Sequence, residues 1–290
     1  VNDDWTLGGG FARRTKVDGS DDPLEPTADA AISPLEDGVR SPLTQAEAYT
    51  SAYFGASYQT ESMAGSSRLE TRDSTTGSRL VAVLGGAREI TKTLSFSAAA
   101  RHQDESLKGQ PDLIDTDIRI GAAWRPKGEG LVVLNRLDIG QSNEDGVQER
   151  SKIVNNLAVN AMLNDQTQLS VYHGIKHVDA EFAGATASGA THLLGAEIRH
   201  DVTQKVDIGL QTTWASNNGS NSEVWSFGPS IGFTPEDNIW VSLGYNVSGF
   251  DDADFEAAKY RNEGPYIKLR AKFDQHTAKG VLQALGFDQR

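Results

Sequence analysis

The sequence predicts an all-β protein made of antiparallel strands. Along most of the 290 residues, apolar and polar side chains alternate at every second position, as they do in strands with one apolar and one polar face. The run 239–247 is an example, with Ile, Val, Leu, Tyr and Val on one face and Trp, Ser, Gly and Asn on the other. Stretches with the helical period of 3.6 residues are almost absent, so no large helical part is expected.

The alternation predicts about fourteen strands. Four are expected in the N-terminal part, at 5–14, 46–59, 66–73 and 79–89. The others are expected to begin near Leu94, Asp117, Leu131, Lys152, Leu169, Leu193, Val206, Val224 and Ile239, with a final run over 266–273. The start Asn2-Asp3-Asp4 is similar to a turn, which predicts that further strands or domains precede it and makes fourteen a minimum.

The connections between these strands alternate in length. Short polar turns are expected at 90–93, 126–130, 164–167, 202–205 and 234–238, and loops rich in Gly, Asn and Asp at about 102–116, 140–150, 179–190, 215–223 and 248–264. The strands that follow the short turns recur every 33 to 38 residues. An up-and-down meander with tight turns at one end and long loops at the other is typical of a transmembrane β-barrel, with periplasmic turns and extracellular loops.

A soluble β-sandwich would show the same alternation, and the tryptophans favour the membrane barrel. Trp5, Trp124 and Trp240 lie beside short turns, whereas Trp214 and Trp225 lie beside a long loop. Indole rings at both ends of an apolar band are typical of the aromatic belts at membrane interfaces. Trp240 is the exception in parity, because it belongs to the polar face of its strand.

The two faces of each strand are expected to contact different environments. The apolar face is expected to contact acyl chains, and the polar face to surround a wet lumen. The side chains expected to line that lumen are Arg119, Arg125, Arg136, Lys152, Asp207, Lys268, Arg270 and Lys272. Pro229 stands inside a strand, where it removes a backbone donor, so it predicts a bulge or a local edge.

Composition excludes several functional classes. The chain has no cysteine, which excludes disulfides, Cys-ligated zinc and a thiol nucleophile. A net charge of −13 argues against general nucleic-acid binding. No stretch approaches the ~18 uninterrupted apolar residues of a transmembrane helix, and residues 1–5 do not begin a signal peptide. The common catalytic motifs are absent, so neither an enzyme nor a cofactor is expected.

Acidic segments occur at two places. Residues 16–42 are expected to form a long acidic surface loop. Asp251, Asp252 and Asp254 form the densest acidic run; a solvated loop is the ordinary interpretation, and a divalent-cation site is the weaker alternative. We expect one barrel domain over 1–275, followed by a periplasmic tail over 276–290.

The C-terminal segment resembles the closing hairpin of Gram-negative outer-membrane barrels, particularly those that end large repeat-containing surface proteins. The resemblance rests on Ile239-Trp-Val-Ser-Leu-Gly-Tyr-Asn-Val, Gly249-Phe-Asp-Asp-Ala-Asp-Phe and Tyr260-Arg-Asn-Glu-Gly-Pro-Tyr-Ile-Lys-Leu-Arg-Ala-Lys-Phe273. It covers roughly residues 66–275 and implies a barrel-closing strand that carries Gly264, Ile267, Leu269 and Phe273. It also implies recognition by the barrel-assembly machinery, although the chain continues past Phe273 where such chains often stop.

Three functions follow as hypotheses. The first is a Gram-negative outer-membrane barrel that anchors, or provides passage for, part of a larger surface or envelope complex. The second is a passive diffusion porin with a basic lumen, and the third is a soluble all-β binding module. The expected partners are outer-membrane lipids and lipopolysaccharide, the assembly machinery and other envelope proteins.

Overall fold

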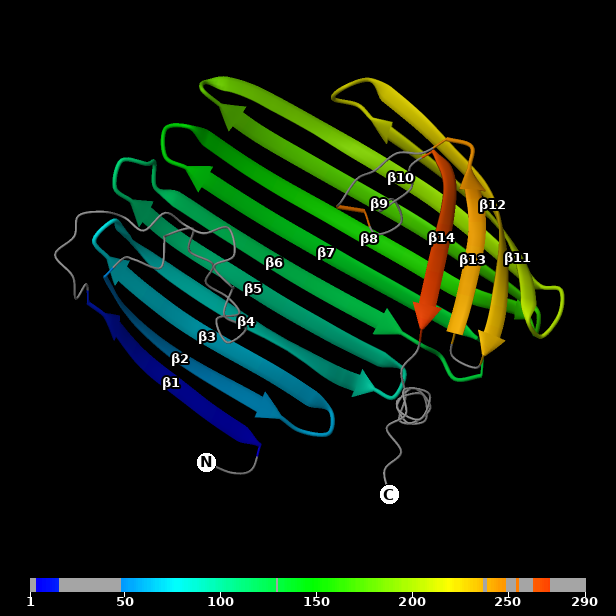
Figure 1. The fold of residues 1–290 in the computed structure, drawn as a ribbon, viewed down its shortest axis with the longest axis horizontal. Coiled ribbons are helices and arrows are strands. Elements are labelled where there is room, and N and C mark those ends of the chain that lie inside the picture. Colours follow the sequence, from blue (N-terminus) through cyan, green and yellow to red (C-terminus); the bar gives the residue numbers. More distant parts are fainter. Residues whose placement is uncertain are drawn as a thin grey trace. The chain divides into compact units, whose positions relative to one another are not determined.

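Fourteen β-strands form one antiparallel series in a computed structural model, which describes residues 4–15, 48–128, 130–236, 239–248, 254–255 and 263–271 (Figure 1). None of the described segments is a helix with the length and apolar character needed to cross a bilayer. The strands are β1 (Trp5–Arg14), β2 (Tyr49–Gln59), β3 (Met63–Ser74), β4 (Gly77–Thr91), β5 (Leu94–Leu107), β6 (Leu113–Trp124), β7 (Leu131–Glu144), β8 (Gln148–Asn164), β9 (Thr167–Phe182), β10 (Ala185–Asp201), β11 (Val206–Asn217), β12 (Ser222–Glu236), β13 (Ile239–Asn246) and β14 (Gly264–Ala271).

The strand order in the sheet is the order in the sequence, from β1 to β14. Each strand therefore pairs with its sequence neighbour, which confirms the predicted all-β, up-and-down antiparallel topology and the number of strands. The ladders are long and continuous: all ten residues of β1 pair with β2, and all twelve of β11 pair with β12. The predicted segment 5–14 coincides with β1.

Several connections are shorter than expected, because the strands continue into the segments assigned to loops. Only Ala183 and Gly184 separate β9 from β10, both with positive φ, and residues 108–112 join β5 to β6. The first residues of β10, Ala185 to Ser188, are all exposed. Such strand ends are wet on both faces, so they lack the alternation from which a strand is predicted. The long connections are those between β1 and β2 and between β13 and β14.

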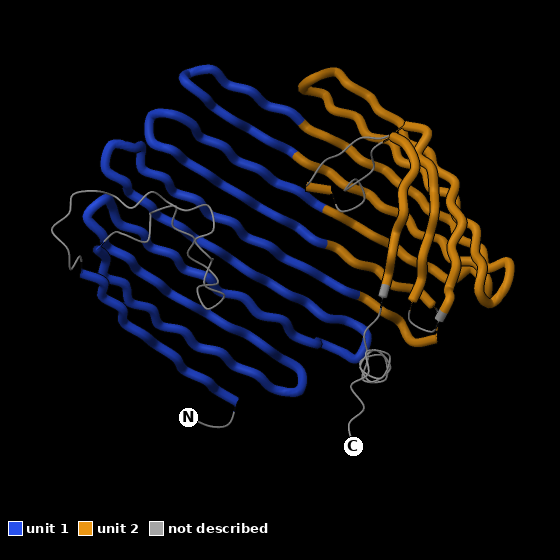
Figure 2. The backbone as a smooth tube through the Cα atoms, viewed as in Figure 1, with its two compact units in different colours: residues 1–123, 136–155, 177–189 blue, residues 124–135, 156–176, 190–290 orange. Residues whose placement is uncertain are grey.

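The chain divides into two compact units (Figure 2). Unit 1 comprises residues 1–123, 136–155 and 177–189, and unit 2 comprises residues 124–135, 156–176 and 190–290. Unit 1 contains β1 to β5, nearly all of β6 and parts of β7 to β10, and unit 2 contains the remaining parts of these strands together with β11 to β14.

The strands expose their apolar face and bury polar side chains. In unit 2, Ile208 is 50% exposed, Leu243 54% and Leu269 69%. On the opposite face of β11, Asp207, Gln211 and Thr213 are buried. A soluble sandwich has the reverse arrangement, with large aliphatic side chains inside. The faces are therefore oriented as a membrane barrel requires.

Pro229 marks an irregularity in the β12–β13 ladder. On the β11 side it pairs in register with Leu210. On the β13 side the regular pairing ends at Ser230 opposite Gly244, and an isolated bridge joins Phe227 to Ser248, which lies beyond the end of β13. The proline thus lies where regular pairing with β13 stops, and the register shift of this ladder lies farther along, between Phe233 and Glu236.

Candidate functional site

Small residues of β12 leave room for longer side chains on the polar face of unit 2. On β12 the inward positions are occupied by Ser226, Gly228, Ser230 and Gly232. A Cβ atom at Gly232 would clash with the Asp207 carboxylate and would lie 2.6 Å from Nε1 of Trp240. The absence of side chains here allows long polar side chains of β11 and β13 to lie across β12.

Asp207 is the centre of a buried charged network. Its carboxylate is 10% exposed and accepts hydrogen bonds from the guanidinium of Arg199 and, at 2.7 Å, from Nε1 of Trp240. The same guanidinium donates to Glu197 at 3.0 Å and lies 4.5 Å from the Trp240 ring centroid. Because each member has a partner, the network satisfies its buried polar atoms and holds the indole ring in place.

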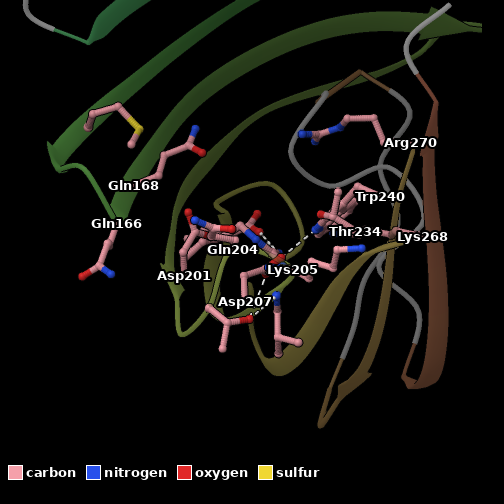
Figure 3. A pocket seen from close by; sticks show the side chains of 15 residues that line it. Gln166, Gln168, Asp201, Gln204, Lys205, Asp207, Thr234, Trp240, Lys268 and Arg270 are labelled. Atoms are coloured by element: carbon pink, nitrogen blue, oxygen red, sulfur yellow. Dashed lines mark hydrogen bonds and ion pairs between the residues drawn. The ribbon is translucent and has the colours of Figure 1, made fainter. Parts of the chain in front are cut away.

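Next to this network is a cavity of about 370 Å³, which lies at the short-turn end of unit 2 (Figure 3). The β8–β9 and β10–β11 turns form one side of it, and the ends of β13 and β14 form another. Besides Arg199, three cations line it, namely Lys205, Lys268 and Arg270. Arg270 pairs across the ladder with Trp240 and lies 5.2 Å from its ring centroid. The volume is within the range of small-molecule sites.

A second feature of unit 2 is a seat for Phe255, which belongs to the long β13–β14 connection. Phe255 is fully buried, and a Cβ atom at Gly174 in β9 would lie 2.6 Å from its ring. The preceding residue, Asp254, pairs with Lys176 of β9 at 3.3 Å and accepts a hydrogen bond on its backbone oxygen from Asn156 of β8 at 3.2 Å. We call Gly174, Lys176 and Asn156 the Phe255 seat.

Unit 1 carries a row of charged contacts on its polar face. Arg79 of β4 donates to Gln103 of β5 at 2.8 Å. Arg101 of β5 pairs with Asp115 of β6 at 3.5 Å. Asp138 of β7 accepts from Arg119 of β6 at 2.5 Å and from Arg136 of its own strand at 2.8 Å. These side-chain contacts connect the four consecutive strands β4 to β7.

The predicted lumen residues are distributed over both units. Arg119 and Arg136 share Asp138 in unit 1, and Lys152 is half-buried on β8. Asp207, Lys268 and Arg270 meet at the cavity of unit 2. Arg125 is exposed in the connection after β6, and Lys272 lies outside the described residues. The predicted closing strand is β14, which holds Gly264, Ile267 and Leu269, whereas Phe273 also lies outside the described residues.

Four of the five tryptophans lie near strand ends, and their membrane-interface position stays a prediction. Trp5, Trp124 and Trp225 are 48%, 43% and 60% exposed, and Trp214 donates to Glu223 at 2.5 Å near a strand end. Trp240 is a correction: it lies on the polar face, where its N–H is bound to the buried Asp207. Its parity already indicated this position, because it alternates with Val241 and Leu243.

In the acidic run, the Asp254 carboxylate pairs with Lys176 at 3.3 Å. The cation site suggested there as the weaker alternative stays a prediction. Asp251 and Asp252 lie outside the described residues, and no group of three or more His, Asp or Glu within the described ranges is arranged to hold a metal ion. Sequence analysis missed Phe255 and Lys176, because their contact joins residues 79 positions apart.

Comparison with known proteins identifies the fold. No protein-family model and no curated protein matches the sequence. Among solved structures, the siderophore receptor PirA from Pseudomonas aeruginosa aligns with a TM-score of 0.54 at 11% identity, covering 69% of this chain and 41% of the receptor. The siderophore receptor PirA from Acinetobacter baumannii aligns with a TM-score of 0.52 at 7% identity, covering 69% of this chain and 40% of the receptor.

These alignments span about two fifths of each receptor. At such low identity they show a shared fold. Together with the strand order and the exposed apolar face, they show that the chain has the up-and-down fold of an outer-membrane β-barrel.

Proposed function

We propose that this chain is the membrane-embedded wall of a Gram-negative outer-membrane barrel that anchors, or provides passage for, part of a larger envelope complex. The observation that carries the proposal is the orientation of the strand faces. Large apolar side chains such as Leu243 and Leu269 are more than half exposed while Asp207 and Gln211 are buried. Apolar surface of this extent requires a lipid or protein partner, and paired strands satisfy the backbone within the bilayer.

The polar face favours an anchor or translocation component over an open basic pore. In unit 1 the predicted basic lining is compensated, because Arg119 and Arg136 share one carboxylate. In unit 2 the chain's own Phe255 occupies the polar face. Passive diffusion is the second candidate, and the polar cavity at the short-turn end is the observation that favours it.

The membrane location is tested by a charge on the apolar face. Leu243→Arg is expected to destabilise the folded barrel by about 2–4 kcal/mol if position 243 lies near the bilayer centre. Two quantities are measured. One is the fraction of protein that keeps heat-modifiable gel migration, and the other is the urea concentration at which half of the protein unfolds in lipid vesicles. Leu243→Phe is the matched control and should retain both. Wild-type protein that stays in the aqueous fraction without detergent would contradict the proposal.

Planar-bilayer recordings separate the two candidates. An anchor or translocation component with an occupied polar face should show no steady conductance on its own. A passive porin should show stable, open conductance steps without any partner. Steady anion-selective conductance of the isolated wild-type protein would replace the first candidate by the second.

A further inference from the structure

The cavity in unit 2 has an excess of positive charge among its lining residues. Two of its carboxylates, Glu197 and Asp207, are bound to Arg199. Asp201 is the one further carboxylate of the lining. The other cations of the lining are Lys205, Lys268 and Arg270. With Arg199 counted, four cations and three carboxylates line the cavity, so the lining carries one net positive charge, which favours an anionic ligand.

Arg270 is positioned to supply the main anion contact. Its guanidinium lies 5.2 Å from the Trp240 ring centroid, and it makes no ion pair with a carboxylate in the described parts of the chain. Contact with an aromatic face restricts the guanidinium without using its N–H donors. A carboxylate or phosphate can then accept two parallel hydrogen bonds from it.

Two contacts hold the Trp240 ring in place. Its N–H is bound to Asp207, and Arg199 lies 4.5 Å from the ring centroid. Because Asp207 is buried, this arrangement resists rearrangement when a ligand enters. The aromatic surface that Arg270 contacts is thus in place before binding, which lowers the entropic cost of association.

The remaining lining indicates a hydroxylated ligand. Amide and hydroxyl side chains of Gln166, Gln168, Thr203, Gln204 and Thr234 surround the cavity. These groups donate and accept hydrogen bonds without charge. Figure 3 shows Gln166 and Gln168 on the side of the cavity opposite Arg270 and Trp240.

We propose that this cavity binds a small hydroxylated organic anion, whose carboxylate or phosphate group is held by Arg270 with Lys268 and Lys205 nearby. The inference goes beyond the anchoring or passage function, since a binding site of this kind is compatible with either. Glucose 6-phosphate, gluconate and glucose are suitable probes, because they share a polyol body and differ in the anionic group.

The test is calorimetric titration of the full chain, folded in detergent micelles, with each of the three probes. We expect saturable binding of glucose 6-phosphate or gluconate and none of glucose at the same concentrations. Arg270→Gln should weaken the anion's affinity about tenfold or more, the loss expected for a hydrogen bond to a charged group. Arg68→Gln is the matched control, because Arg68 pairs with Glu70 in unit 1, and it should leave affinity unchanged.

Heat-modifiable migration of each variant shows that it is folded, so a loss of affinity is not confused with a loss of the barrel. Binding that is equal for glucose and the two anions would overturn the proposal. Absence of binding for all three probes, or an Arg270→Gln variant with wild-type affinity, would overturn it as well. Neither result would alter the membrane-fractionation test of the proposed function, so the two failures are distinguishable.

Discussion

The two units organise their polar faces by different means. In unit 1 charged side chains of neighbouring strands contact one another in a row. Arg79 at its β4 end is only 10% exposed, but farther along the row Arg119 and Arg101 are exposed by 63% and 39% of their side-chain surfaces. In unit 2 the central pair is much drier than these two, with Arg199 at 17% and Asp207 at 10%. An ion pair of the β5–β7 part of unit 1 therefore has a smaller energetic weight than the Arg199–Asp207 pair, because water screens it more.

The difference depends on small residues. Gly228 and Gly232 of β12 leave space for Asn246, Asp207 and Trp240 to lie over the strand. Gln211 then donates to Asn246 at 2.7 Å, so a second buried contact forms beside the Asp207 network. Unit 2 thus encloses its polar groups between side chains of several strands, whereas the β5–β7 part of the charged row in unit 1 is wetter.

The largest predicted effect is at Asp207. Asp207→Asn removes the charge that balances Arg199 in a buried site, and it should lower the free energy of unfolding by about 3 kcal/mol. Urea titration in lipid vesicles measures this change. Asp201→Asn is the control: Asp201 is an exposed carboxylate of the same cavity, and its loss should cost less than about 0.5 kcal/mol. Equal effects of the two variants would show that the burial of Asp207 does not give its charge the expected weight.

An intermediate effect is expected at the Phe255 seat. Gly174→Ala places a methyl group against the Phe255 ring and should destabilise the fold by about 1–3 kcal/mol through overcrowding. The same urea titration applies, and tryptic cleavage of the β13–β14 connection should become faster if the aromatic ring leaves the seat. Gly8→Ala on β1 is the control, because a Cβ atom there meets nothing within 4 Å. A Gly174→Ala variant with wild-type stability and cleavage would argue against the seat.

The smallest effect is expected in unit 1. Asp138→Asn weakens two contacts, with Arg119 and Arg136, yet the partial exposure of these side chains limits the cost to about 1 kcal/mol or less. Raising the salt concentration should reduce the difference between this variant and wild type further, since exposed charges are screened. A cost as large as that of Asp207→Asn would remove the contrast between the units.

Much of the fold could be predicted from the residues alone. The segment 5–14 coincides with β1, and the starts at Leu94, Leu131, Val206 and Ile239 coincide with those of β5, β7, β11 and β13. These strands alternate cleanly because one face contacts an apolar environment and the other does not. β10 begins at Ala185, earlier than the expected Leu193. Its first residues are exposed on both faces and therefore show no alternation of apolar and polar side chains.

The candidate site was only partly predictable. Parity predicts Asp207, Lys268 and Arg270 on the polar face, and the structure brings them to one cavity. Trp240 is predicted at the membrane interface as an aromatic residue at a strand end, and its opposite parity is the signal that marks it as the exception. The Asp254–Lys176 pair and the burial of Phe255 have no local pattern, since their partners lie on a distant strand.

The sequence by itself determined the strand series, its antiparallel topology and which side chains share a face, because alternation with a period of two is a local property of the chain. Only the tertiary structure decided which face is buried, how β10 to β14 bring Arg199, Asp207, Trp240 and Arg270 together, and where Phe255 is seated. These contacts depend on ladder register and on glycines that leave room across several strands, and neither is encoded in any single segment.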